Sequence, residues 1–220
     1  MFLSSLKDYR NNELKWFLLA NILLMLISSN VFSLSLDDNE LKIVEKIGTI
    51  VSVVFFSAII YVYTFIFDSV MPSNIKVHLV FLFCKKPSDT IFTQILRKCN
   101  DDRFTVEDAK KQYKEIYDQI DKNSKLKENQ TALWYEIYNR HRDNSIVYGS
   151  NRDYLLLRDL HSQTVTLVPI YIILALMTGI ITVSIEYLIY LFCMIIILNI
   201  GARVQGKRVI YNVLAVDLNH

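Results

Sequence analysis

Apolar residues gather in four long runs near the two ends of the chain, and polar residues fill the segment between them. The runs cover residues 14–34, 47–67, 165–183 and 187–204. An α-helix needs about 20 mostly apolar residues to cross the roughly 30 Å hydrocarbon core of a bilayer. Backbone groups in lipid must find their hydrogen bonds within the chain, which favours helices. The pattern therefore predicts an all-α membrane protein with four transmembrane helices.

The four runs form two pairs. Ser184, Ile185 and Glu186 alone separate the third run from the fourth. A single helix of about 40 residues would be twice as long as the bilayer is thick, so we expect a tight hairpin that turns at Glu186. The predicted organisation is an N-terminal tip over 1–13, a first hairpin over 14–70, a polar domain over 71–163, a second hairpin over 164–204 and a C-terminal tail over 205–220.

The polar domain is expected to be small and mainly helical. Residues 75–84 are apolar but too few for periodicity to distinguish a strand from a segment lying in the membrane interface. The further elements expected are a helix capped by Ser88 that runs to about Lys98, a helix that begins at Thr105, a helix over 127–142, a loop over 144–151 and a helix that resumes near Arg152. The helix from Thr105 carries an apolar stripe of Tyr113, Ile116, Tyr117 and Ile120, which would face a core or a partner.

Lysine and arginine predict the orientation, because loops that stay in the cytoplasm carry an excess of both. The loop between the first two runs holds Lys42 and Lys46 among several acidic residues, and the turn between the last two runs holds no cation. Every other Lys and Arg lies in the two tips, in the polar domain or at the end of a run next to them. We therefore expect both termini and the polar domain to be cytoplasmic.

Composition argues against an enzyme. The chain has five glycines and no P-loop, G-x-G-x-x-G, H-E-x-x-H or G-x-S-x-G motif. The sequence therefore predicts neither a glycine-rich loop that binds phosphate nor a nucleophile elbow. Its three cysteines (Cys84, Cys99 and Cys193) are far apart and are expected to be reduced thiols. We expect no catalytic residues, no bound metal and no cofactor.

Polar residues inside the apolar runs are candidates for the lining of a water path. The pore-lining candidates are Asn21, Ser28, Ser57, Thr64, Asp68 and Asn199. Acidic residues of the outer turns would gather at the outer mouth of a pore and favour cations, namely Asp37, Asp38, Glu40 and Glu186. The alternative is that these polar groups hold the helices together by hydrogen bonds.

A candidate ligand site comprises cations and aromatic residues of the polar domain. Aromatic faces beside arginine suit a nucleotide or a single-stranded oligonucleotide. The candidates are Lys85, Lys86, Arg97, Lys98, Trp134, Tyr138, Arg140, Arg142, Arg152 and Arg158. The alternative is that the aromatic residues are core and the cations are solvated or lie near lipid phosphate.

This layout of two hairpins around a small helical domain resembles the small transmembrane effectors of bacterial antiphage defence systems, of the CBASS type or the Hailong type. The resemblance covers the layout of the whole chain. It implies an oligomeric channel in the bacterial inner membrane that depolarises or permeabilises that membrane. Its expected partners are membrane lipid, further copies of the chain, and a nucleotide or oligonucleotide made by a partner nucleotidyltransferase. That ligand would gate the channel through the cytoplasmic domain. The alternative function is a non-catalytic membrane adaptor that docks a soluble partner through the stripe of Tyr113, Ile116, Tyr117 and Ile120.

Overall fold

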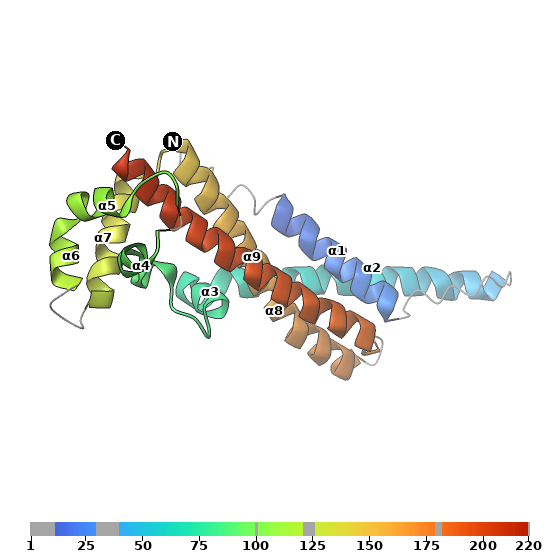
Figure 1. The fold of residues 1–220 in the computed structure, drawn as a ribbon. Helices are drawn as coiled ribbons and strands as arrows, with labels where there is room; N and C mark the ends of the chain where they lie inside the picture. The colour runs from blue at the N-terminus through green and yellow to red at the C-terminus, as the bar shows by residue number, and fades with distance from the viewer. Residues whose placement is uncertain (1–11, 30–39, 100, 121–125, 179–181, 220) are drawn as a thin grey trace. The chain divides into compact units, whose positions relative to one another are not determined.

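The described part of the chain is all helical, as the sequence predicts. The computed structural model describes residues 12–29, 40–99, 101–120, 126–178 and 182–219 (Figure 1). It is 85% helix, with no strand among the described residues. The helices are α1 (Glu13–Ser28), α2 (Glu40–Val70), α3 (Ser73–Val80), the 3-10 helix η2 (Pro87–Asp89), α4 (Ile91–Arg97), α5 (Val106–Gln112), α6 (Lys114–Ile120), α7 (Leu126–His141), α8 (Ser145–Thr178) and α9 (Ile185–Leu218).

The described residues form two compact units. We call the first the apolar unit; it holds the described residues of 12–79 and of 156–200. We call the second the polar unit; it holds the described residues of 80–155 and of 201–219. The unit boundaries differ from the segment boundaries expected from the sequence, because α8 and α9 each contribute to both units.

Four helices share the hydrophobic core of the apolar unit. Leu18 and Met25 of α1, Ile60 of α2, Leu167 and Tyr171 of α8, and Tyr187 and Leu191 of α9 belong to one buried cluster. At its centre the rings of Tyr171 and Tyr187 meet edge to face, with centroids 5.0 Å apart. The hydroxyl of Tyr187 also donates to the backbone oxygen of Asn21, at 3.0 Å. Each ring therefore contributes buried area and also satisfies a polar group.

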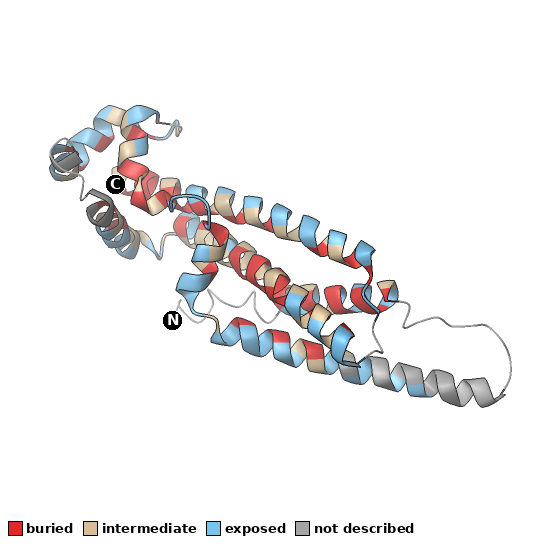
Figure 2. Ribbon diagram, turned by 90° about the horizontal axis from the view of Figure 1, so that it is seen from below, coloured by how far each residue is buried: buried red, intermediate tan, exposed pale blue. Residues whose placement is uncertain are grey.

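Two described helices are long and apolar enough to cross a membrane. They cover Ser145–Met177, which contains most of the third run, and Ile185–Leu218, which contains the fourth. The bent pair Ser57–Val70 and Ser73–Val80 would count as a third if it were one span. Only 22% of the most apolar 18-residue stretch of α9 is buried within the structure. Most of that stretch therefore faces outward (Figure 2). The four-span topology stays a prediction.

The core of the polar unit is built by α4 to α7, the start of α8 and the end of α9. Val213 and Leu214 of α9 are fully buried in it, so the residues expected to form a C-terminal tail are helical and packed. Tyr113 and Tyr117 lie in the same core, where both rings pack edge to face on Phe92 at 5.2 and 6.2 Å. These two tyrosines are therefore core residues rather than part of an exposed docking face.

Two expected helix starts can be compared with the caps observed. Thr105 caps α5 as expected: its hydroxyl accepts from the Asp108 backbone N–H at 3.2 Å, and the Asp108 carboxylate accepts from the Thr105 backbone N–H at 3.1 Å. The helix does not run on unbroken, because the backbone leaves helical geometry at Tyr113 before α6 begins. Ser88 lies within the 3-10 helix, and Thr90 holds the cap position of α4.

Three other sequence predictions were wrong in detail. Residues 144–151 were expected to be a loop, but α8 begins at Ser145 because the Asn144 side chain accepts the backbone N–H of Ile146 at 3.0 Å. The segment 75–84 was expected to be a strand or an interfacial segment, but α3 covers its first part and turns follow. The break before α9 also precedes Glu186, since Ser184 caps that helix by accepting the backbone N–H of Tyr187 at 3.2 Å.

Candidate functional site

Four charged side chains are buried together in the apolar unit. They are Asp68 of α2, Lys76 of α3, and Arg158 and Asp159 of α8, with exposed fractions of 5%, 2%, 5% and 0%. We call these four residues the charge cluster. Burial of a charge is strongly unfavourable unless it is paired and hydrogen-bonded, so a cluster of this kind is an unusual feature of an apolar unit.

A sharp bend brings the first two members together. The axes of α2 and α3 differ by 96° across the break at Met71 and Pro72. Proline disfavours helical geometry at the residue before it, so α2 ends and a new helix starts at Ser73. The bend directs the ammonium of Lys76 onto the carboxylate of Asp68, with which it forms a buried ion pair.

The other two members come from consecutive positions of α8. Arg158 donates from Nε and Nη2 to Oδ1 of Asp159, at 2.9 and 2.8 Å. Its Nη1 donates to the hydroxyl of Ser73 at 3.0 Å, which ties α8 to the start of α3. The ammonium of Lys76 lies 3.7 Å from Asp159 Oδ1, so it joins the two pairs into one network. Two cations and two anions cancel, and the cluster is formally neutral.

Further polar groups are buried beside the charge cluster. Ser162 of α8 donates to the sulfur of Met71 at 3.1 Å, and Nε2 of His161 lies 3.4 Å from the Asn199 amide of α9. The hydroxyl of Thr64 on α2 is fully buried and has no hydrogen-bond partner among the described residues. The interior of the apolar unit is therefore polar around the charge cluster.

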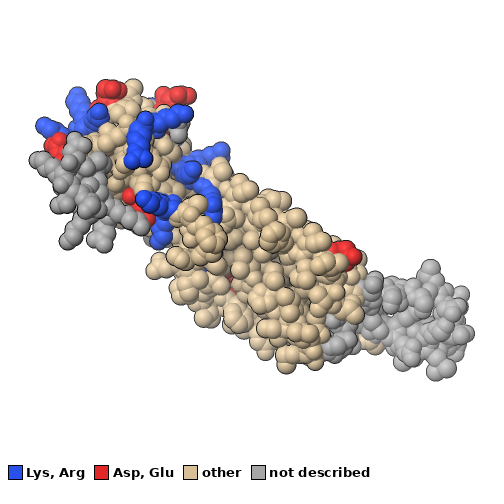
Figure 3. Space-filling model, turned by 60° about the horizontal axis from the view of Figure 1, so that its bottom comes forward, with Lys and Arg blue, Asp and Glu red and all other residues tan. Residues whose placement is uncertain are grey.

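The outer surface of the apolar unit has the opposite character. Large apolar side chains such as Phe55, Phe65, Phe192 and Ile197 are more than half exposed. In Figure 3 the Lys and Arg side chains gather over the polar unit, and the visible face of the apolar unit is almost entirely free of charge. Buried charged side chains and exposed apolar side chains are the reverse of the arrangement in a water-soluble domain.

The structure places the pore-lining candidates at several levels of the apolar unit. Asp68 belongs to the charge cluster, and Thr64 and Asn199 lie in the polar band beside it. Asn21 is buried in the core and donates to the backbone oxygen of Phe17, at 2.8 Å. The remaining two candidates are half-buried, as Asn199 is: Ser57 lines a groove between α1 and α2, and Ser28 donates to Met25 O at 3.0 Å.

The outer-mouth candidates are described only in part. Asp37 and Asp38 lie outside the described residues, and Glu40 begins α2 without a described side chain. Glu186 is exposed in the first turn of α9, where its carboxylate accepts a hydrogen bond from the Ser184 hydroxyl at 2.7 Å.

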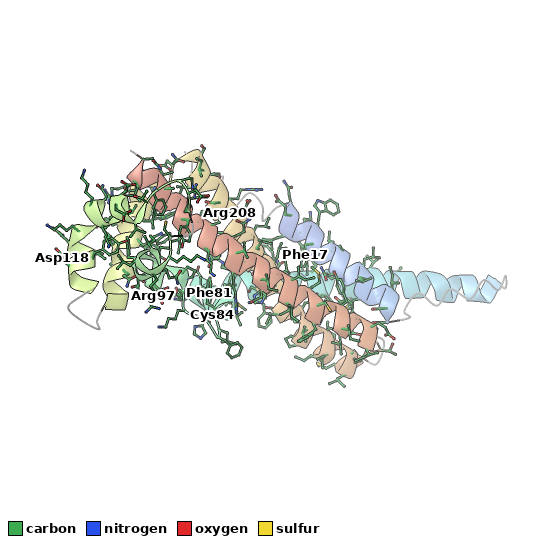
Figure 4. The ribbon with its side chains drawn as sticks, in the orientation of Figure 1. Phe17, Phe81, Cys84, Arg97, Asp118 and Arg208 are labelled. Carbon is green, nitrogen blue, oxygen red and sulfur yellow. The ribbon has the colours of Figure 1, made fainter. Side chains whose placement is uncertain are left out.

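The ligand-site candidates do not converge on one place. Lys85, Lys86, Arg97 and Lys98 are exposed around α4, where Figure 4 labels Arg97 near Phe81 and Cys84. Trp134 is buried, and its ring stacks on Tyr138 with centroids 5.4 Å apart, so it does not offer a free face.

The arginine candidates are dispersed as well. Arg140 approaches Asp217 at 3.8 Å. Arg142 and Arg152 each lie 4.0 Å from the acidic residue that follows them. Arg158 is enclosed in the charge cluster and is not available to a soluble ligand.

A second polar cluster holds the polar unit together. Asp217 of α9 accepts the hydroxyl of Tyr113 at 2.7 Å, and its other carboxylate oxygen lies 2.7 Å from Nε2 of His141. Burial, together with the hydrogen bond to Asp217, raises the pKa of Tyr113 well above its ordinary value. Among the described residues no group of three His, Cys, Asp or Glu could hold a metal ion. Asp217 thus links the end of α9 to α7 through His141 and to the segment between α5 and α6 through Tyr113.

Sequence reasoning missed half of the charge cluster. It named Asp68 and Arg158 in different roles and did not single out Lys76 or Asp159. A signal was available: opposite charges flank Pro72 at the end of the second apolar run, and an Arg–Asp pair stands just before the third run. Comparison of the chain with family models, with curated proteins and with solved structures finds no match.

Proposed function

We propose that the chain is a multi-pass membrane protein in which α1 and α2 cross the bilayer as one hairpin and α8 and α9 as a second. The observation that carries this proposal is the reversed polarity of the apolar unit, with Asp68, Lys76 and Asp159 inside and apolar side chains outside. Hydrocarbon can cover the outer surface without cost, and ionisable groups in a membrane protein face the bundle interior and pair with one another. In water the same unit would expose an unusually large apolar area.

The distribution of cations supports an orientation with both termini and the polar unit in the cytoplasm. The polar unit adds a local argument. Phe83 is 88% exposed in the turn after α3, and the exposed Lys85 follows two positions later. An exposed aromatic ring beside a cation suits the headgroup region of an anionic leaflet.

We propose further that several copies assemble into a channel and that the charge cluster keeps it closed. Buried ionisable groups in membrane proteins mark ion or proton routes and their gates. Here each cation is satisfied by an anion, so the cluster offers no free charge to a passing ion. Separation of Lys76 from its two carboxylates would expose charge to a polar band that already contains Thr64 and Asn199.

The position of the cluster along the chain explains how the polar unit would control it. The chain passes between the units at 79/80, 155/156 and 200/201. Lys76, Arg158 and Asn199 each lie within a few residues of one of these points. A ligand that binds one arrangement of the polar unit more tightly would therefore shift the population of closed and open channels. In the antiphage setting suggested by the layout, that ligand is a nucleotide or an oligonucleotide and the result is depolarisation of the inner membrane.

Single-cysteine labelling tests the topology. Cys84 is exposed and serves as the cytoplasmic probe once Cys99 and Cys193 are replaced by serine. Glu186→Cys in a background without other cysteines serves as the outer probe. A membrane-impermeant maleimide should label the outer probe in intact cells and Cys84 only after permeabilisation. Equal labelling of both in intact cells would contradict the proposed topology.

Membrane potential tests the function. Cells that express Lys76→Met should lose the signal of a potential-sensitive dye, whereas cells that express the wild type or Lys86→Met should keep it. Lys86 is an exposed lysine in the polar unit and controls for the loss of one positive charge. An unchanged potential with membrane-inserted Lys76→Met would refute the proposed gate.

A further inference from the structure

An open groove of about 510 Å³ lies between α1 and α2 in the apolar unit. Apart from Lys15 and the hydroxyls of Ser57 and Tyr61, the side chains that line it are apolar. Its walls include Leu19, Leu23 and Leu26 from α1, and Val54, Ala58 and Val62 from α2. Figure 4 shows α1 with its side chains lying alongside α2.

The length of the groove matches one leaflet of a bilayer. Its α1 wall extends from Lys15 to Leu26, and a helix rises by 1.5 Å per residue. The wall is therefore about 16 Å long, which is roughly half of the 30 Å hydrocarbon core. An extended acyl chain of one leaflet has this length and this apolar character.

A cation marks one end of the groove. Lys15 is exposed, and Trp16 beside it is 67% exposed. Lysine places its ammonium at the headgroup level while its stem lies along apolar surface, and tryptophan is enriched at the same level. Glu13 stands two positions earlier on α1, and residues at that spacing do not face each other, so it does not neutralise Lys15 at the groove.

We propose that this groove binds one acyl chain of an anionic phospholipid and that Lys15 binds the lipid phosphate. Charge complementarity at the headgroup end selects this occupant over a zwitterionic lipid. The site rests on the proposed membrane insertion but not on conduction. It would make the first hairpin sensitive to the anionic lipid content of the leaflet in which Lys15 lies.

Electron paramagnetic resonance of spin-labelled lipid tests the site. The full chain is placed in phosphatidylcholine nanodiscs that contain either spin-labelled phosphatidylglycerol or spin-labelled phosphatidylcholine. Carbonate extraction of the expressing membranes is done first. Protein that carbonate removes would refute membrane insertion and this site with it, whereas retained protein isolates the question of lipid binding.

Three variants separate the parts of the proposal. The wild type should immobilise phosphatidylglycerol with roughly fivefold preference, the effect expected of one lysine near an anionic headgroup. Lys15→Gln should abolish the preference and keep the immobilised lipid. Ala58→Phe fills the groove and should remove immobilised lipid of both kinds. Ala20→Phe is the matched control, because Ala20 is exposed on α1 and does not line the groove.

Three results would overturn the proposal. The first is the absence of a phosphatidylglycerol preference in carbonate-resistant wild type. The second is an Ala58→Phe spectrum equal to that of Ala20→Phe. The third is dissociation of an oligomer by Ala58→Phe without any change in immobilised phosphatidylglycerol, which would assign the groove to a second copy of the chain. Lys15→Arg keeps the charge and should retain the preference, so the headgroup test does not depend on the folding of Ala58→Phe.

Discussion

Replacement of Lys76 by methionine should destabilise the apolar unit strongly, because it removes the charge that joins the two ion pairs. Methionine keeps most of the length and apolar stem of lysine. The ammonium of Lys76 lies 3.7 Å from Asp159 Oδ1 and also pairs with Asp68. At an effective dielectric constant of roughly 20, two unit charges at this distance attract by about 4 kcal/mol.

The net effect follows from the charge that stays behind. Without Lys76, the buried carboxylate of Asp68 loses its ion pair with that ammonium, while Arg158 remains paired with Asp159. Removal of one partner from a buried ion pair costs about 3–5 kcal/mol, since the other charge is left uncompensated. We therefore expect Lys76→Met to lower the free energy of unfolding by this amount.

A second substitution should rescue the first. Lys76→Met combined with Asp68→Asn leaves Arg158 and Asp159 as a neutral pair. The double variant should recover about 2 kcal/mol relative to the sum of the single variants, which is within the range of coupling energies between residues in contact. Lys86→Met is the control, and at an exposed site it should change stability by less than about 0.5 kcal/mol.

The assay is reversible unfolding of the full chain in mixed micelles by increasing amounts of sodium dodecyl sulfate, followed by circular dichroism. Wild type, Lys76→Met, Asp68→Asn, the double variant and Lys86→Met are compared under one condition. If Lys76→Met unfolds at the same point as Lys86→Met, the charge cluster contributes nothing measurable and the reasoning fails. If adding Asp68→Asn to Lys76→Met restores no stability, Lys76 and Asp68 are not energetically coupled.

Three further predictions concern the polar unit and the helices that reach it. The pKa of Tyr113 is raised in the folded state, so the stability that Tyr113 contributes is complete below the ordinary tyrosine pKa of about 10 and declines as pH rises above it. Thermal melts at increasing pH should show this decline in stability, and Tyr113→Phe should make the decline smaller. Thr105→Ala removes the hydroxyl that caps α5 and should cost about 1 kcal/mol in the same melts, whereas Thr105→Ser should be nearly neutral. Gly149→Ala places a methyl group in open space within α8 and should stabilise the protein by about 0.5–1 kcal/mol. Gly206→Val should destabilise it by about 1–3 kcal/mol, because a Cβ at position 206 would already lie 3.2 Å from the Tyr154 ring. Equal melting temperatures for the two glycine variants would contradict this.

The sequence predicts the elements of the apolar unit better than their contacts. Long apolar runs indicate helices because burial in lipid and hydrogen bonding within the helix act locally. The charge cluster depends on contacts between distant positions, such as that between Arg158 and Ser73, which are 85 residues apart. Hydrophobic periodicity cannot predict such pairs, because it reports only on neighbouring positions of one helix. Asp68 could be named as a pore-lining candidate, but its partner Lys76 could not be identified.

Local signals were also outweighed by packing in the polar unit. Gly149 and its polar neighbours suggested a loop, yet Asn144 caps a helix there and Val147 is fully buried in the core. Residues 205–220 were expected to form a C-terminal tail, yet α9 continues to Leu218 and Val213 is buried in the core of the polar unit. In both places the buried apolar face on one side of the helix decides the structure.

The central claim is that the intact charge cluster holds a membrane channel closed, and ion flux from proteoliposomes tests it most directly. Purified wild type, Lys76→Met, the double variant with Asp68→Asn, and Lys86→Met are each reconstituted into liposomes loaded with potassium, without any added ligand. The account predicts rapid potassium efflux through Lys76→Met and negligible efflux through the other three proteins. Equal efflux through Lys76→Met and wild type, with insertion of both shown by carbonate extraction, would contradict it.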